Sequence, residues 1–259
     1  MIMLVRIELL KIRTARMSFG LLAAAVGMTT LIAALDAARA GGKFTPPLSS
    51  SKGLSFVVTT TGFALLMAFI MGIIVTSGEF RHRTATLTYL AAPRRGRVLA
   101  AKVLASFGAG LTFGAAGGAA ADAVGLAFAA GKGYAVAVGT ATLARYGAGA
   151  MLAGGLLAAL GAGIGSLVRS QLAAVVGALV WCLLMESILS GVFGSLSPYL
   201  PFSAASTLGG SRLGGGDIGF FTASPFQPLP FAGAAALLAG LAVVAAAVAA
   251  ATTSRADIT

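Results

Sequence analysis

Long apolar runs separated by short polar segments are the dominant pattern along this chain. A membrane-spanning helix needs about 20 consecutive, mainly apolar residues, and six runs approach or exceed that length. They cover approximately Met17 to Leu35, Ser55 to Thr76, Val98 to Ala130, Leu143 to Val168, Leu172 to Phe193 and Phe231 to Ala251. The pattern predicts an all-α integral membrane protein with six transmembrane helices in a single domain, 1–259.

Two of the six runs carry further information. The third run is longer than one span needs, so we expect part of it to tilt, project from the bilayer or lie at the interface. Glycines recur at intervals of four, which lets helices approach closely. They are Gly110, Gly114 and Gly118 in the third run and Gly161 and Gly165 in the fourth. We expect them to serve packing between spans.

The segment before the first run, residues 1–16, has an amphipathic pattern. It sets Ile2, Leu9 and Ile12 against Arg6, Arg13 and Arg16. This arrangement favours a short helix lying on the membrane surface. A cleaved signal peptide is the rival interpretation, because Ala38-Arg39-Ala40 resembles a cleavage site. The long charged leader and the length of the apolar run argue against it.

Composition and charge support a membrane location. Hydrophobic residues make up 58% of the chain and charged residues only 10%, against roughly a quarter charged in soluble domains. The net charge of +11 would indicate a nucleic-acid partner in a soluble protein. Here the bases lie mostly between the runs, where they contact lipid headgroups, and we expect no nucleic acid to bind.

The distribution of Lys and Arg predicts the orientation. With six spans, one side carries twelve of these residues and the other carries six. The basic side faces the cytoplasm. We therefore expect a multi-pass protein of the bacterial plasma membrane with both termini in the cytoplasm.

The sequence lacks the motifs of the common catalytic centres. No G-x-x-x-x-G-K-[ST] phosphate-binding loop and no H-E-x-x-H zinc motif occurs, and His82 is the only histidine. Cys182, the only cysteine, lies inside an apolar run and can form neither an intrachain disulfide nor a cysteine cluster. We expect no enzymatic activity, cofactor or metal in this chain.

Three ionisable residues within or near the spans are candidate functional groups. Glu186 lies about 17 residues after Arg169, roughly 25 Å along a helix, and an acid at that depth is a functional hypothesis. It either takes part in an external gate or caps a broken helix before Pro198. Asp122 and Arg145 lie near the outer ends of their spans, where they either pair with each other or reach water.

Four segments, in order, resemble the membrane subunit (permease) of ABC-2-type ABC transporters, and look like the actinobacterial kind. The second and third are the most specific, because their Gly-Glu and Pro-Arg-Arg-Gly-Arg elements have the expected separation. The segments are Ile7-Glu8-Leu9-Leu10-Lys11-Ile12-Arg13-Thr14-Ala15-Arg16, Ser77-Gly78-Glu79-Phe80-Arg81-His82-Arg83-Thr84, Ala92-Pro93-Arg94-Arg95-Gly96-Arg97-Val98-Leu99-Ala100-Ala101-Lys102 and Gly165-Ser166-Leu167-Val168-Arg169-Ser170-Gln171-Leu172-Ala173-Ala174.

The resemblance implies the membrane subunit of an ATP-driven exporter. A second copy of the chain, or a paralogue, would complete the pore, and two separate cytoplasmic ATPase subunits would bind ATP and Mg. It also implies an N-terminal elbow helix within 1–16, a cytoplasmic coupling helix within 78–97 and a partly re-entrant extracellular segment within 194–230. The cargo stays unidentified, although the apolar lining suits an amphipathic or hydrophobic molecule.

The residues of the implied coupling helix fit contact with a partner. A helix from Glu79 sets an apolar side apart from several charged positions and places an acid in its first turn, where it complements the helix dipole. The residues expected to couple are Glu79, Phe80, Arg81, Thr84, Leu87 and Leu90. The alternative is a solvated cytoplasmic loop. Two other functions stay open: an ion-gradient-driven secondary transporter, and a non-transporting sensor or assembly module.

Overall fold

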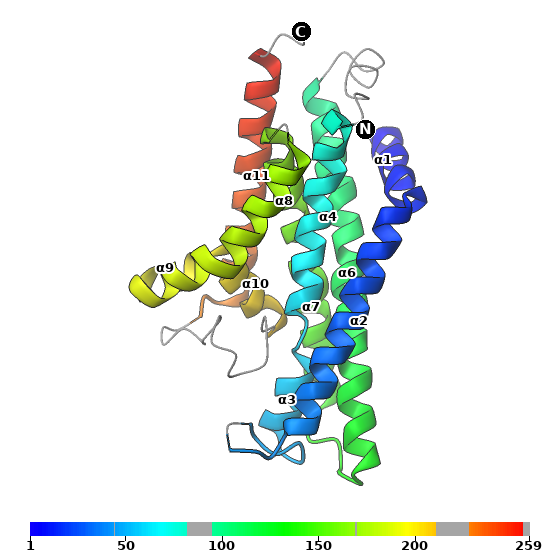
Figure 1. Cartoon of the computed structure of the whole chain (residues 1–259), viewed down its shortest axis with the longest axis vertical. Coiled ribbons are helices and arrows are strands. Elements are labelled where there is room, and N and C mark those ends of the chain that lie inside the picture. The colour runs from blue at the N-terminus through cyan, green and yellow to red at the C-terminus, as the bar shows by residue number, and fades with distance from the viewer. Residues whose placement is uncertain (44, 82–94, 169, 211–227, 256–259) are drawn as a thin grey trace.

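The protein is a bundle of long helices in which the first helix begins and the last helix ends at the same end (Figure 1). The structure, a computed structural model, describes residues 1–43, 45–81, 95–168, 170–210 and 228–255. The longer helices are α1 (Ile2–Thr14), α2 (Arg16–Arg39), α3 (Ser51–Val58), α4 (Gly62–Arg81), α6 (Arg95–Gly131), α7 (Thr140–Leu167), α8 (Gln171–Val180) and α11 (Phe231–Arg255). Between α8 and α11 lie the π-helix η1 (Trp181–Met185), α9 (Glu186–Val192), the 3₁₀-helix η2 (Gly194–Tyr199) and α10 (Pro201–Gly209).

Six helical stretches are long and apolar enough to cross a membrane, which confirms the predicted count. They are Arg16–Arg39, Ser51–Gly78, Gly96–Gly131, Thr140–Leu167, Gln171–Val192 and Phe231–Thr252. The third run forms one continuous helix, α6, of 37 residues, about 55 Å long at 1.5 Å per residue. Because a bilayer core is about 30 Å thick, α6 must tilt or project beyond it.

The second span is interrupted where the sequence appears continuous. α3 ends at Val58 and α4 begins at Gly62. Between them the Thr59 and Thr60 hydroxyls donate to the carbonyl oxygens of Ser55 and Phe56, at 2.7 and 3.2 Å. The Ser55 carbonyl also accepts from the Thr59 backbone N–H. The threonine hydroxyls therefore add hydrogen bonds to carbonyl groups at the end of α3.

Glycines allow α7 to lie directly against its neighbours. α7 packs on α4, α6, α10 and α11. A Cβ atom added at Gly110 or Gly114 of α6 would lie under 3.0 Å from the α7 backbone, and one at Gly161 or Gly165 of α7 would lie as close to α4. The predicted role in packing between spans is confirmed for these four glycines. Gly118 has more room, since its nearest neighbour would be 3.6 Å away.

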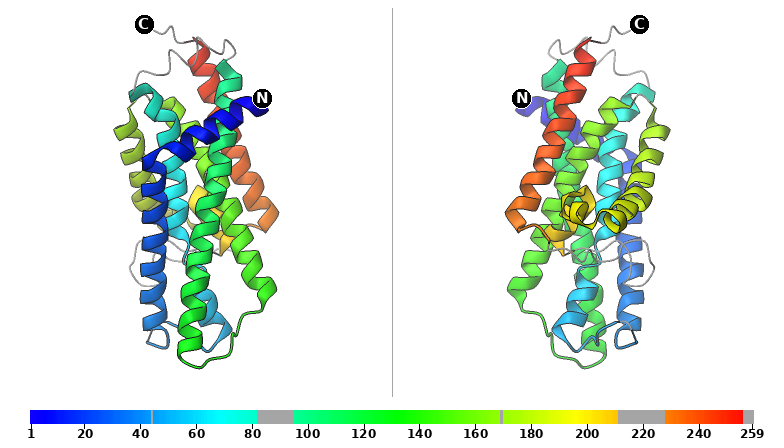
Figure 2. Two further views of the ribbon diagram at one scale, coloured as in Figure 1. Left: turned by 90° about the vertical axis from the view of Figure 1, so that its right-hand side faces the viewer. Right: turned by 90° about the vertical axis from the view of Figure 1, so that its left-hand side faces the viewer.

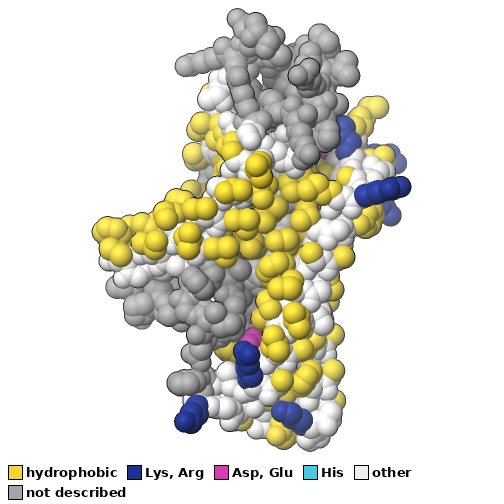
Figure 3. All heavy atoms as spheres, viewed as in Figure 1, with side chains coloured by type: hydrophobic (Ala, Val, Ile, Leu, Met, Phe, Trp, Pro, Cys, Tyr) yellow, Lys and Arg dark blue, Asp and Glu magenta, His cyan; other side chains and the backbone are white. Residues whose placement is uncertain are grey.

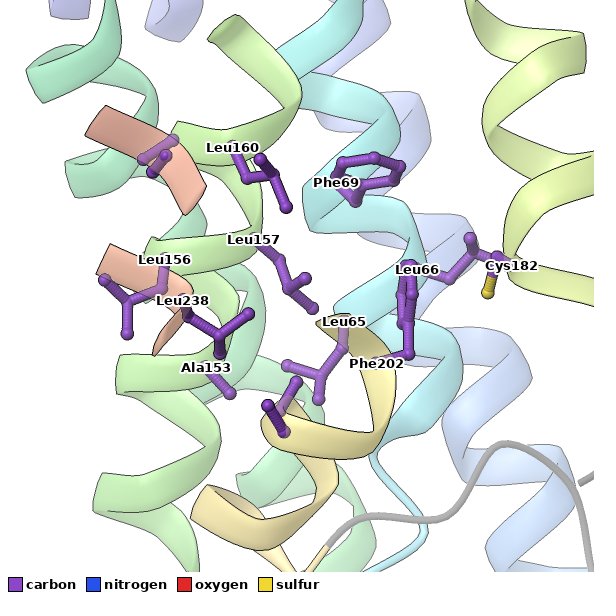
Figure 4. Packing of buried hydrophobic residues seen from close by; sticks show 14 of the residues in the cluster. Leu65, Leu66, Phe69, Ala153, Leu156, Leu157, Leu160, Cys182, Phe202 and Leu238 are labelled. Carbon is purple, nitrogen blue, oxygen red and sulfur yellow. The ribbon is translucent and has the colours of Figure 1, made fainter. Parts of the chain in front are cut away.

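Apolar side chains from five α-helices and η1 fill the centre of the bundle, several of them labelled in Figure 4. Phe69 of α4 and Phe202 of α10 stack edge to face, with ring centroids 5.5 Å apart. Cys182 of η1 is fully buried in the same cluster. α10 is thereby held inside the bundle by the same contacts that hold α4 and α7 together.

The surface has the layered character of a membrane protein. Hydrophobic side chains cover the middle of the face in Figure 3, and Lys and Arg side chains gather toward its two ends. Residues on α8, η1 and α9 are exposed and apolar, among them Leu172, Val176, Ile188 and Val192. α9 diverges from the bundle in Figure 1. These surfaces suit contact with lipid or with another membrane protein.

Candidate functional site

The carboxylate of Glu186 joins α9 to α10 inside the bundle. Its side chain is buried, and Oε1 accepts a hydrogen bond of 2.7 Å from the Ser203 backbone N–H. Ser203 is the third residue of α10, whose first residue is Pro201 and whose C-cap, Gly210, is left-handed with φ of 64°. A carboxylate at this point satisfies one of the unpaired N–H groups of the helix N-terminus and complements its dipole.

The second oxygen of the same carboxylate has no hydrogen-bond partner. Glu186 Oε2 is buried, and nothing in the described part of the chain bonds to it. An unsatisfied buried carboxylate oxygen is costly. Glu186 also begins the first turn after the π-helix η1, and π-helical turns are frequent at functional sites. Glu186 is therefore the most unusual polar group in the fifth span.

Glu186 caps a helix, but not one before Pro198 as the sequence interpretation had it, and a gating role stays a prediction. The helix that it caps is α10, which begins after Pro198. Along the long axis of the bundle, α9 and α10 lie near the middle, whereas α3 lies near one end (Figure 1). Movement of α9 relative to α10 would break the Glu186–Ser203 hydrogen bond.

Asp122 and Arg145 are not brought together. Asp122 is half-buried on α6, Arg145 is exposed on α7, and no ion pair joins the two. Their proposed pairing is absent from the structure. The exposed Arg145 fits the alternative in which the side chain reaches water.

The implied coupling segment lies largely outside the described residues. α4 continues to Arg81, so Glu79, Phe80 and Arg81 belong to a helix, and the structure describes nothing of their side chains. Thr84, Leu87 and Leu90 lie within 82–94, outside the described residues. The contact surface formed by these six residues stays a prediction.

A buried ion-pair network on the N-terminal helix was missed by the sequence analysis. Glu8 of α1 accepts from Lys11 Nζ at 2.8 Å through Oε1 and from Lys102 Nζ at 3.0 Å through Oε2. The Glu8 and Lys102 side chains are only 7% and 5% exposed. Burial raises the pKa of Glu8, but Lys102 and Lys11 outweigh it and lower the pKa below its usual value. Glu8 therefore stays ionised and fixes α1 on α6.

A sequence signal for this network existed. Glu8 and Ile12 are four residues apart and share a face of α1, and both are buried in the structure. All other charged residues of this segment are basic. An acid on the same helix face as an apolar residue therefore indicates a basic partner on the helix against which that face packs. Nothing in the sequence names Lys102 as that partner, because 94 residues separate it from Glu8.

A second buried acid was also missed. Asp36 of α2 is 5% exposed. Its Oδ2 lies 3.1 Å from the Thr60 hydroxyl oxygen and shares that hydroxyl's one proton with the Phe56 carbonyl oxygen. Thr60 lies in the break between α3 and α4, so this contact ties α2 to the interrupted second span. Asp36 is one turn from the end of α2, close to the predicted outer side.

Comparison with known proteins does not assign a family. No protein-family model matches the chain, and no curated protein matches it.

Proposed function

We propose that this chain is the membrane subunit of an ATP-driven exporter of the ABC-2 type. Support comes from six helices of membrane-spanning length together with the four segments that resemble this family. The observation that carries the proposal is the position of two helix ends. α4 ends, and α6 begins, at the end of the bundle where α1 begins and α11 ends (Figure 1).

The packing of α4 and α6 provides a route for mechanical coupling. Both helices lie against α7, and at the glycine positions their backbones come into direct contact with it. A partner that displaced segment 82–94 would move the adjoining ends of α4 and α6, and both of these helices pack against α7. Closely packed elements transmit such displacements because they shift as rigid bodies.

We propose that this movement changes the contact between α9 and α10. α7 also contacts α10, where a Cβ atom at Gly149 would lie under 3.0 Å from the Leu208 backbone. α10 in turn is held by Glu186 of α9. Displacement of α7 thus reaches the Glu186–Ser203 contact, which we assign to the external gate of the exporter.

Purification tests this function directly. Tagged chain isolated in mild detergent from its own cells is expected to bring down a nucleotide-binding subunit in equal amounts, with ATPase activity in the complex. The chain alone in liposomes is expected not to transport. Transport by the chain without any ATPase would refute the proposal.

Two observations favour an ion-gradient-driven transporter as the second candidate. The unsatisfied Glu186 Oε2 could hold a proton, and the second span is interrupted beside buried Asp36, as spans often are in secondary transporters. This candidate predicts proton-dependent transport without ATP that Glu186→Gln abolishes. The exporter account predicts ATP dependence in both the parent and the variant.

A further inference from the structure

The outward face of α1 combines basic and apolar side chains in one stripe. Met3, Arg6, Leu10 and Arg13 recur at intervals of three and four residues, so they share one side of the helix. All four are exposed. Arg16 and the exposed Met17 follow at the start of α2 and extend the same basic and apolar character.

The opposite face of α1 packs against the bundle. Glu8 and Ile12 are buried there, and Glu8 is held by Lys102 of α6. α1 runs obliquely across the end of the bundle in the left view of Figure 2. Its outward stripe is therefore held in a fixed orientation and is exposed.

Within the described part of the chain, no acid pairs with the charges on this stripe. Glu8 is the only acid of α1 and is turned inward to Lys102 and Lys11. No carboxylate in the described part of the chain forms an ion pair with Arg6, Arg13 or Arg16. Guanidinium groups bind phosphate oxygens in bidentate geometry, and the neighbouring Met3 and Leu10 can enter the acyl-chain boundary.

We propose that α1 carries a binding surface for anionic phospholipids, formed by Arg6, Arg13 and Arg16 with Met3 and Leu10. The charge complementarity selects a phospholipid with net negative charge over a zwitterionic one. The Glu8–Lys102 ion pair makes the surface rigid, because it holds the helix on α6 while the arginines face the headgroups. This inference holds whether or not ATP drives the protein.

Quenching of a single tryptophan by brominated lipids in bilayers measures lipid binding at this surface. Trp181 is the only tryptophan, so Trp181→Phe with Leu10→Trp places a single reporter on the stripe. Quenching by brominated phosphatidylglycerol and by brominated phosphatidylcholine, each in symmetric vesicles of the full chain, gives the relative binding constant at the reporter. Because each base near the surface contributes roughly a fivefold preference, we expect phosphatidylglycerol to bind at least fivefold more tightly.

Matched charge removals distinguish the surface from the overall charge of the protein. Arg6→Gln/Arg13→Gln/Arg16→Gln is expected to bring the preference close to one. Arg39→Gln/Lys52→Gln/Lys132→Gln removes three exposed bases from the other end of the bundle and is expected to leave the preference unchanged. Equal binding of the two lipids to the reporter chain, or a preference that survives the first triple change, would overturn the proposal.

Two measurements on the reporter chain test the lipid preference without the triple variants, so their outcome does not depend on whether those variants fold. Raising the salt from about 0.1 to 1 M shortens the screening length from about 10 to 3 Å and is expected to reduce the preference severalfold. A preference insensitive to salt contradicts the role of the arginines. Glycerol phosphate is expected not to displace the lipid, and displacement at millimolar concentration contradicts a role for apolar side chains at positions 3 and 10.

Discussion

The Glu8–Lys102 ion pair offers the sharpest test of how the N-terminal helix is attached. Glu8→Gln removes the carboxylate charge that faces Lys102 Nζ at 3.0 Å, with both side chains at most 7% exposed. Removing one member of a buried ion pair costs about 3–5 kcal/mol. The glutamine side chain retains one oxygen acceptor, so we expect the low end, about 3 kcal/mol of unfolding free energy, and a melting temperature lower by roughly 6–12 °C.

Thermal unfolding in detergent, followed by loss of the monodisperse peak in size exclusion, provides the assay. Lys11→Met is the matched control, because Lys11 also contacts Glu8 but is 49% exposed, and an exposed pair contributes about 0.5 kcal/mol or less. Glu8→Gln/Lys102→Met is expected to cost less than the sum of its single changes by about 2 kcal/mol. Additive single changes, or an effect of Glu8→Gln no larger than that of Lys11→Met, would refute the reasoning.

The same pair predicts a pH dependence with a definite sign. The pKa of Glu8 is lower in the folded protein than its ordinary value of 4.5, so the unfolded chain takes up the proton first as the pH falls. The stabilisation is complete above about pH 4.5 and is lost as the pH falls through the lower, folded pKa. The difference in melting temperature between the parent and Glu8→Gln is therefore expected to be constant at neutral pH and to shrink below pH 4. A difference that grows on acidification contradicts this assignment.

Two further pairs of substitutions test the packing of the spans and the cap of α10. Gly114→Ala introduces a methyl group against the α7 backbone and is expected to cost about 1–3 kcal/mol. Gly27→Ala, with nothing within 4 Å of its Cβ, is expected to be neutral or stabilising by up to about 1 kcal/mol; equal effects would contradict the close approach. Glu186→Ala removes the acceptor of the Ser203 N–H and is expected to cost about 1–2 kcal/mol, whereas Glu186→Gln keeps an acceptor and recovers most of the loss. Identical melting temperatures for the two Glu186 variants would argue against the cap.

The number and order of the spans could be predicted from the sequence because lipid contact demands long apolar runs. The interruption of the second span could not, because it contains no proline or charge. The hydroxyls of Thr59 and Thr60 bond to carbonyl groups of α3 at this break, and threonine does not interrupt an apolar pattern. The π-helix η1 could not be predicted either, since its five residues are as hydrophobic as those of α8.

The candidate site depends more on contacts between distant segments. Glycine spacing predicted close packing, but the partner of each glycine became known only from the structure. Glu186 was singled out as an acid within a span, whereas its contact with Ser203 follows from the return of α10 into the bundle. Glu8 was counted only as part of an amphipathic segment, because its partner Lys102 lies far along the chain.

The central claim is that a separate ATPase binds segment 78–97 of this chain. The most direct measurement compares recovery of a nucleotide-binding subunit by tagged parent chain and by Glu79→Arg/Leu87→Asp in mild detergent. Arg39→Gln/Lys52→Gln/Lys132→Gln, altered at the other end of the bundle, is the control. The account predicts equal amounts of ATPase with the parent and control and at least a tenfold loss with the double variant, while all three remain monodisperse. Failure of any ATPase to accompany folded parent chain, or undiminished recovery by the double variant, would contradict it.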